Sequence, residues 1–207
     1  MKKQVSLIAL LAFLLMSFKV TDDVQDKEQN VIWFGIDFSN ARLIGSYGFS
    51  DPEKIRDTYF PAINNLVLSE PKKYNLEKYY KLPKVRHDLS VVKERNKSIN
   101  MDESIIDDFF TFEEGQLEKV VREYVSEQHT TGTGILYVVE ALNKTQATGH
   151  IHVVFFDIAS KEILWTKKYE QLVTGFGFRN YWASSVYRAM KASGKDYRKF
   201  QRKQRKK

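Results

Sequence analysis

The chain has 207 residues, 43% of them hydrophobic, with no cysteine and a formal net charge of +7. This length suits one domain with a real hydrophobic core and leaves too little chain for a second domain. Without cysteine the protein has neither disulfides nor a lipid-bearing amino-terminal cysteine, so packing alone must hold the fold.

The amino-terminal segment has the layout of a secretory signal. Residues 1–20 open with two lysines and continue as an apolar run from Val5 to Phe18. The run is short for a membrane span, and no clear small-x-small cleavage site follows it. We therefore expect export to the periplasm or the cell surface, with residues 1–20 either cleaved or kept as a membrane anchor. Residues 21–30 are polar and are predicted to form a linker.

The domain is expected over residues 31–194, and its first elements have clear patterns. The run VIWFGIDF, residues 31–38, predicts a central strand buried on both faces, because it shows little alternation of apolar and polar residues. Residues 51–69 predict a helix capped by Asp51. Pro61 should kink or divide that helix.

The middle of the chain gives weaker patterns. Residues 72–84 are polar and aromatic and are predicted to be irregular, and residues 85–96 are predicted to form a second strand. A helix is expected from about Glu113, and residues 135–142 predict a third, central strand. The helix prediction rests on one apolar stripe, made of Leu117, Val120, Val121, Tyr124 and Val125.

A hairpin and a closing helix complete the domain. Residues 150–158 and 162–173 flank a short turn, where Asp157 can bind the backbone. A glycine-rich loop then leads into a helix over residues 179–193. The resulting order, β-α-β-α-β-β-β-α, predicts an α/β fold with a single mixed sheet and helices packed on it.

The order of elements and the hairpin sequence carry a resemblance over about half the chain. The hairpin reads FDIASKEILW, in which Asp157, Ser160, Ile163 and Trp165 approximate a D-x-x-(T/S)-G-x-(I/L)-W pattern, while Lys161 stands where a glycine is expected. In this respect the chain resembles bacterial cell-envelope domains of the TolB amino-terminal and CsgG-like type. The resemblance implies a non-catalytic assembly or interaction domain of the cell envelope.

Two histidines in the hairpin form the nearest approach to a ligand-binding pattern. His150 and His152 point to one side of the strand, and pairing about the turn places them opposite Glu170 and Lys168. We predict that this side faces solvent, because the other side gathers Ile151, Val153, Phe155, Trp165 and Tyr169. In the alternative, a metal site, His150, His152 and Glu170 would be joined by His87, Asp88 or His129.

Catalytic patterns are otherwise weak. Ser46 follows a glycine, but it lies outside a GxSxG elbow, and neither glycine-rich stretch has the phosphate-loop lysine. No cofactor is therefore expected. A metal-dependent or serine hydrolase of the periplasm remains the alternative to a non-catalytic binding or assembly module that contacts an envelope protein.

Two glycine-rich aromatic loops are the candidate binding surface. Aromatic residues and arginine are common anchors of binding patches, although such residues also pack beneath loops. The candidate residues are Tyr47, Phe49, Phe176, Phe178, Arg179, Tyr181 and Trp182.

The carboxyl-terminal tail, residues 195–207, holds all the excess positive charge. It has 8 basic residues and 1 acidic residue, so the rest of the chain keeps 25 of its 33 basic and 25 of its 26 acidic residues. A neutral body argues against a nucleic-acid-binding face. The tail is predicted to be a frayed helix end or a disordered extension that either aids solubility or contacts an anionic surface, such as the membrane. Its basic residues are Lys195, Arg198, Lys199, Arg202, Lys203, Arg205, Lys206 and Lys207.

Overall fold

The structure, a computed structural model, describes residues 30–206. The expected signal segment, all but the last residue of the expected linker, and Lys207 lie outside this range. Within it, no helix combines the length and the apolar composition that a membrane crossing requires.

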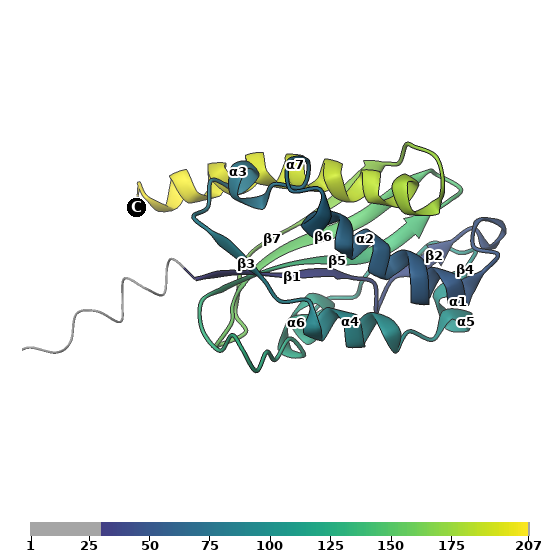
Figure 1. The fold of residues 1–207 in the computed structure, drawn as a ribbon, viewed down its shortest axis with the longest axis horizontal. Helices are drawn as coiled ribbons and strands as arrows, with labels where there is room; N and C mark the ends of the chain where they lie inside the picture. Colours follow the sequence, from purple (N-terminus) through teal and green to yellow (C-terminus); the bar gives the residue numbers. More distant parts are fainter. Residues whose placement is uncertain (1–29, 207) are drawn as a thin grey trace, which may run out of the picture.

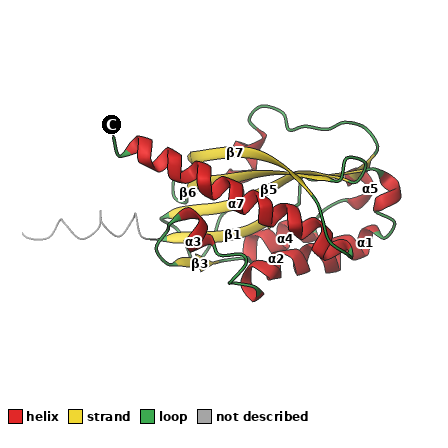
Figure 2. Cartoon of the chain, turned by 90° about the horizontal axis from the view of Figure 1, so that it is seen from above, coloured by secondary structure: helices red, strands yellow, loops and turns green. Residues whose placement is uncertain are grey.

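One mixed sheet of seven strands forms the centre of the molecule, which confirms the expected α/β fold. Five strands run in the order β3-β1-β5-β6-β7, as Figure 2 shows from above, and the short strands β2 and β4 extend the sheet beyond the end of β1. The first five strands pair in parallel, while β6 and β7 form the antiparallel hairpin. The strands are β1 (Val31–Asp37), β2 (Arg42–Ile44), β3 (Val85–His87), β4 (Ile105–Ile106), β5 (Thr133–Asn143), β6 (Thr148–Asp157) and β7 (Ile163–Leu172).

Helices cover both faces of this sheet. In Figure 1, α7, α3 and α2 lie on one face, and α4 and α6 lie on the other. The predicted order of elements is kept, with several short elements added between its members. The helical segments are η1 (Ser46–Gly48), α1 (Pro52–Lys54), η2 (Ile55–Tyr59), α2 (Phe60–Ser69), α3 (Leu76–Tyr80), α4 (Ser90–Lys97), α5 (Met101–Ser104), α6 (Gln116–Arg122) and α7 (Phe178–Gln204).

Strand β1 is buried along its whole length, as its apolar sequence predicted. Strand β3 pairs only with Val31 to Trp33, so the second half of β1 has no strand on that side. Two buried asparagines take the place of a strand. Asn64 of α2 accepts from the Ile36 N–H at 2.7 Å and donates to its carbonyl at 2.9 Å, while Asn96 of α4 donates to the same carbonyl at 3.0 Å. The edge of β1 is therefore satisfied by two helices, one from each face.

The helix predicted over residues 51–69 forms, and it is divided where proline requires it. The Asp51 carboxylate accepts from the Lys54 N–H at 3.3 Å and caps the first turn. Residues 55–59 form a single π-helical turn immediately before Pro61. Because proline has no N–H to donate to the preceding turn, the regular ladder is interrupted there.

Two predictions for the middle of the chain are wrong. Residues 72–84 include a short helix, α3, whose cap Asn75 accepts from the Lys78 N–H at 2.7 Å. The expected strand over residues 85–96 ends at His87, and α4 follows it. Asp88 explains the change, because its carboxylate accepts from both the N–H and the hydroxyl of Ser90 and so forms a turn that ends the strand just before α4.

The helix expected from about Glu113 is also shorter than its stripe suggests. Helix α6 spans only Gln116–Arg122, and Val125 lies exposed beyond it. Tyr124 is buried just after the helix, where its hydroxyl donates to Asp37 at 2.7 Å. That bond ties the end of α6 to the end of β1.

The hairpin forms with the predicted register over most of its length. His150 pairs with Glu170, His152 with Lys168 and Val154 with Thr166. Simple pairing about the turn would place Leu164 opposite Phe156, and that prediction is wrong, because a register shift between Phe155 and Phe156 places Ile163 there. At the turn, Asp157 accepts from the Ser160 N–H at 2.8 Å, and Lys161 adopts a left-handed φ of 64°.

Helix α7 continues well beyond Gly194, unlike the frayed or disordered tail we expected. Tyr197 explains the continuation, because its ring stacks on Phe155 with centroids 3.9 Å apart. Asp196 adds an ion pair with Lys167 at 2.7 Å. The basic segment is thus the last part of a packed helix.

Candidate functional site

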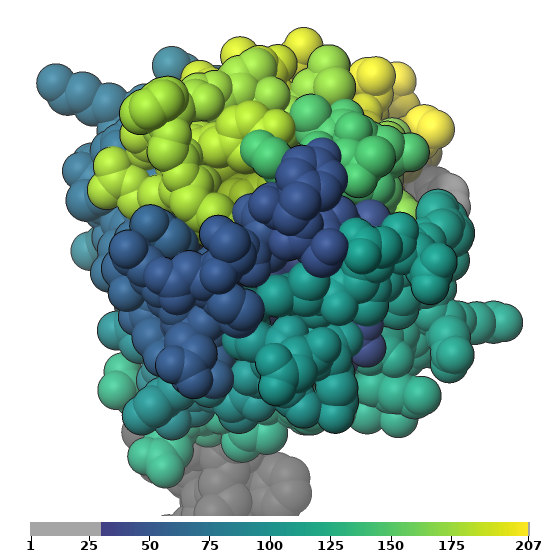
Figure 3. All heavy atoms as spheres, turned by 90° about the vertical axis from the view of Figure 1, so that its right-hand side faces the viewer, coloured from purple at the N-terminus to yellow at the C-terminus, as the bar shows by residue number. Residues whose placement is uncertain are grey.

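The two predicted aromatic loops meet at one end of the molecule. The first loop follows β2, and the second joins β7 to α7. Figure 3 shows this end, where the purple-blue segment near residue 47 lies against the green β5–β6 turn and the yellow-green start of α7. We call the surface formed by Tyr47, Lys144, Phe176 and Tyr181 the aromatic end.

A buried aromatic cluster fixes the first loop to the start of helix α7. The ring of Phe49 stacks on Trp182 at 5.7 Å between centroids and meets Phe178 edge-on at 6.1 Å. Tyr59 stacks on the other side of Phe178 at 4.7 Å. Phe49 and Trp182 are buried, and Phe178 is largely covered. These three candidate residues therefore act as the foundation of the surface.

Three other candidate residues are exposed or partly exposed above this foundation. Tyr47 is 71% exposed and Phe176 is 95% exposed, while Tyr181 is half-buried. The ammonium of Lys144, from the β5–β6 turn, lies 4.3 Å from the centre of the Tyr181 ring. The seventh candidate, Arg179, is exposed and donates to Asn180 at 3.1 Å. The aromatic end thus combines exposed rings with the cation of Lys144.

The first loop is held from the opposite side by Asp107. Its carboxylate accepts from the N–H of Ser46 at 2.8 Å and from the hydroxyl at 3.0 Å. The Ser46 hydroxyl is therefore engaged in fixing the loop that carries Tyr47. This contact gives the serine a structural task.

His150 is buried and His152 is largely covered, so the prediction that the two hairpin histidines face solvent is wrong. His150 is 5% exposed, and His152 is covered by the ring of Phe112, which stacks on it at 5.3 Å between centroids. The covering segment lies between β4 and α6. This segment is distant in sequence from the hairpin, so the alternation of apolar and polar residues in the hairpin could not predict that it covers His152.

The histidines surround a buried carboxylate, Glu140, which is 1% exposed and was absent from our sequence-based candidates. Glu140 lies at a bulge in β5, where the register with β6 shifts between Val139 and Ala141. Its Oε2 atom is hydrogen-bonded to His152 Nε2 at 2.9 Å and accepts from the N–H of Phe112 at 3.1 Å. The carboxylate also forms an ion pair with Lys168. Its oxygen atoms are thus saturated by protein groups.

Burial alone would raise the pKa of Glu140. Interactions with His150, His152, Lys168 and the Phe112 N–H outweigh that effect and hold the pKa well below its ordinary range. Glu140 is therefore a permanent anion at neutral pH. It anchors the segment that covers the sheet.

The suggested metal ligands do not assemble. The Nε2 atom of His150 lies 3.1 Å from the Thr148 hydroxyl and 3.8 Å from the Glu170 carboxylate, and Glu170 is otherwise exposed. Over residues 30–206, no group of three or more His, Asp or Glu side chains is arranged to hold a metal ion.

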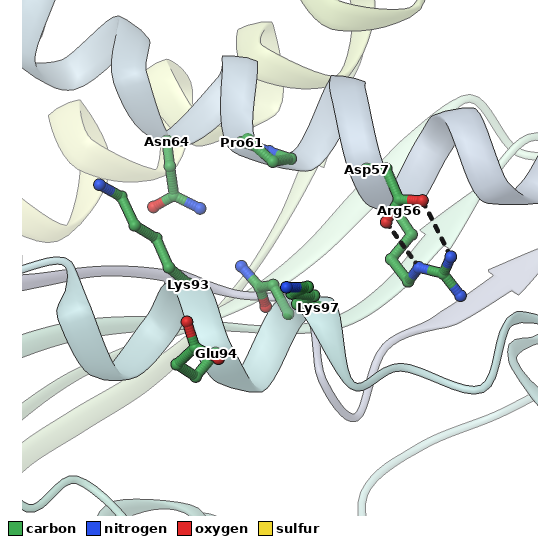
Figure 4. Close-up of a pocket in the computed structure, with 8 residues that line it drawn as sticks. Arg56, Asp57, Pro61, Asn64, Lys93, Glu94 and Lys97 are labelled. Atoms are coloured by element: carbon green, nitrogen blue, oxygen red, sulfur yellow. Dashed lines mark hydrogen bonds and ion pairs between the residues drawn. The ribbon is translucent and has the colours of Figure 1, made fainter.

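A separate groove lies between α2 and α4, and Figure 4 shows it in close-up. Its volume is about 320 Å³, and its floor includes Asn64 and Asn96. Both amides are bound to β1, as described above, and Arg56 at the rim forms an ion pair with Asp57 at 2.7 Å. The groove therefore marks where two helices replace a strand.

The basic end of α7 divides into bound and free cations. Arg198 donates to the carbonyl of Tyr79 at 2.9 Å, and Lys199 lies 3.9 Å from Asp196. The remaining described members of the set are exposed, and within residues 30–206 none of them forms an ion pair. They are Lys195, Arg202, Lys203, Arg205 and Lys206.

Comparison with known proteins adds no assignment: no family model matches this chain, and no curated protein matches it significantly in sequence.

Proposed function

We propose that the protein is a non-catalytic binding module of the bacterial cell envelope, and that the aromatic end docks another envelope protein. The observation that carries the proposal is the exposure of two aromatic rings, Tyr47 and Phe176, in the two loops beside the buried stack of Phe49 on Trp182. Soluble proteins seldom expose rings this fully on a well-packed base, and aromatic anchors dominate protein interfaces.

The foundation favours binding energetically. Because Phe49 stacks on Trp182 of α7, the loop that carries Tyr47 is anchored to the helix and loses little backbone freedom when a partner binds. Lys144 provides a cation beside the Tyr181 ring, so a partner with acidic residues around an apolar patch fits best.

The hairpin turn supports an envelope module of the type the sequence resembles. Lys161 occupies the position where that pattern has glycine, and its φ of 64° is a backbone conformation that glycine adopts most readily. The turn geometry is thus the one that the family pattern would require. Export, expected from residues 1–20, would place the module beside envelope partners.

Site-specific photo-crosslinking in cells tests the docking surface. A photoreactive phenylalanine at position 176 should give one discrete adduct with an envelope protein. The same group at position 164, where Leu164 is also exposed on β7, serves as the matched control and should not give it. The adduct should be lost in Tyr47→Ser and kept in Leu68→Ser, which alters an exposed apolar residue elsewhere.

Identical adducts from positions 176 and 164, or an adduct that survives Tyr47→Ser, would refute docking at the aromatic end. Cell fractionation tests the location independently. A full-length product that stays in the cytoplasm with residues 1–20 attached would refute the envelope assignment.

A further inference from the structure

A second cavity, which the proposed docking surface does not use, opens beside the segment between β4 and α6. Its volume is about 520 Å³, within the range of about 300–1,000 Å³ that is typical of small-molecule sites. We call it the Arg42 pocket. Its lining residues are Asn40, Arg42, Phe109, Phe110, Thr111, Phe112, Glu113 and Gln116.

Two opposite charges line this pocket without pairing. Arg42 and Glu113 form no ion pair with each other, and within residues 30–206 the side chain of neither has another hydrogen-bond or ion-pair partner. The guanidinium of Arg42 lies 5.1 Å from the centre of the Phe110 ring. The ring positions the guanidinium and leaves its N–H donors free.

The rest of the wall is aromatic, with one pair of amides. Phe110 meets Phe112 edge-on with centroids 5.9 Å apart, and Phe109 is 83% exposed beside them. The Gln116 amide donates to Asn40 at 3.2 Å. The pocket therefore offers a cation, an anion and an apolar surface to the same ligand.

The aromatic wall is fixed from behind by the buried carboxylate. Glu140 accepts from the Phe112 N–H, its Oε2 atom lies 3.5 Å from the Thr111 hydroxyl, and His152 supports the Phe112 ring. The pocket is thus held in shape before any ligand enters, which reduces the entropy lost on binding.

We infer that the Arg42 pocket binds a small zwitterion with an apolar side chain, of the class of aromatic α-amino acids. The ligand carboxylate would accept two parallel hydrogen bonds from the guanidinium of Arg42, and the ligand ammonium would face the carboxylate of Glu113. The ligand ring would lie against Phe109 and Phe110. A zwitterion is preferred to a simple anion because Glu113 would repel a ligand that carried negative charge alone.

Calorimetric titration with three probes separates the contributions. L-Phenylalanine should bind saturably, whereas 3-phenylpropionate, which lacks the ammonium, and phenethylamine, which lacks the carboxylate, should each bind at least tenfold more weakly. Arg42→Gln should weaken L-phenylalanine at least tenfold and leave phenethylamine unchanged. Glu113→Gln should remove the preference for L-phenylalanine over 3-phenylpropionate.

Matched controls are Arg122→Gln and Glu114→Gln, which neutralise exposed residues outside the pocket lining. Thermal unfolding confirms that each variant is folded, and Arg42→Lys, which keeps the charge but loses the fork, should bind less tightly than wild type if Arg42→Gln proves unstable. Equal binding of L-phenylalanine and 3-phenylpropionate by wild type, or no saturable binding of L-phenylalanine, would overturn the inference. The crosslinking test at the aromatic end is unaffected by either result.

Discussion

At the scale of single residues, the least expected feature is a fully buried carboxylate on the sheet. Glu140 is surrounded by one lysine, two histidines and a backbone N–H. Such a group stabilises a fold only when all its partners are present, because a buried charge without partners is very unfavourable. Its partners come from β6, β7 and the covering segment, so the buried carboxylate is stable only when all three segments are packed in place.

Replacing Glu140 with glutamine should destabilise the protein by about 3–5 kcal/mol, because it removes the negative charge that pairs with Lys168 and puts an NH2 donor where one acceptor oxygen stood. Urea unfolding at pH 7 measures the change. Glu170→Gln, at an exposed position on the neighbouring strand, is the control and should alter stability by about 0.5 kcal/mol or less. A loss below about 1 kcal/mol in Glu140→Gln would contradict this account.

The pH dependence of stability follows from the same carboxylate. Its pKa is lowered in the folded protein, so the unfolded chain takes up a proton first as the pH falls. The stabilisation from Glu140 is therefore complete at neutral pH and declines below the ordinary glutamate pKa of about 4.3. Urea midpoints between pH 7 and pH 3 should fall less steeply in Glu140→Gln than in wild type. Parallel curves would show that Glu140 is not responsible.

The buried histidines also change what substitution should do. Exchange of both His150 and His152 for glutamine, which a solvent-facing pair would tolerate, should instead cost about 1–3 kcal/mol through lost bonding to Glu140 and lost stacking on Phe112. Thermal unfolding tests this, with His87→Gln at an exposed position as control. An unchanged melting temperature in the double variant would contradict it.

At the scale of elements, the edge of β1 is completed by side chains instead of a strand. Asn64→Ala would leave the N–H of Ile36 buried without an acceptor, which should cost about 1–3 kcal/mol. Asn64→Asp keeps the acceptor but loses the donor to the Ile36 carbonyl, so it is a matched comparison. Hydrogen exchange at Ile36 should accelerate far more in the alanine variant, and equal exchange in both would refute the edge-covering role.

The long elements could be predicted from sequence, and the short ones could not. The apolar runs that form β1 and β5 are buried on both faces. They are rich enough in β-branched and aromatic residues to be predicted as strands from the sequence. Helix α3 depends on its cap Asn75, and α4 depends on tertiary contacts, so their propensity alone is insufficient. The Asp88-x-Ser90 turn just before α4 was the one local signal that could have revealed it.

The candidate site was predicted in part for a similar reason. The two aromatic loops were recognised from their composition, but composition cannot tell which rings are buried. The burial of Phe49 depends on Trp182, which lies far away in sequence. Likewise, the alternation in β6 correctly predicted which residues share a face, while the cover over His152 comes from Phe112. Contacts between distant segments decided each case.

At the scale of the whole molecule, the excess positive charge is gathered at the outer end of α7. Replacing Arg202, Lys203, Arg205 and Lys206 with glutamine should abolish co-sedimentation with anionic vesicles at low salt, because each cation near such a surface contributes about 1 kcal/mol. The melting temperature should be unchanged, since these side chains are exposed. Deleting residues 195–207 is the wrong test, because it would remove Tyr197 from the core.

Neutral vesicles and 0.5 M salt are the controls, and binding should be absent in both because the attraction is electrostatic and screened. If the wild-type protein does not co-sediment with anionic vesicles at low salt, the basic end of α7 has only a solubilising role. Equal binding by the quadruple variant would place any membrane contact elsewhere on the molecule.

The pairing of β1 with β5 sets the order in which the molecule can form during synthesis. Val31 pairs with Thr133, so the most apolar strand of the sheet is made about a hundred residues before its central partner. Until β5 has left the ribosome, β1 has only the three-residue β3 to pair with. A chain with this topology stays open while most of it is being made, and during that interval VIWFGIDF is the segment that a chaperone would need to shield.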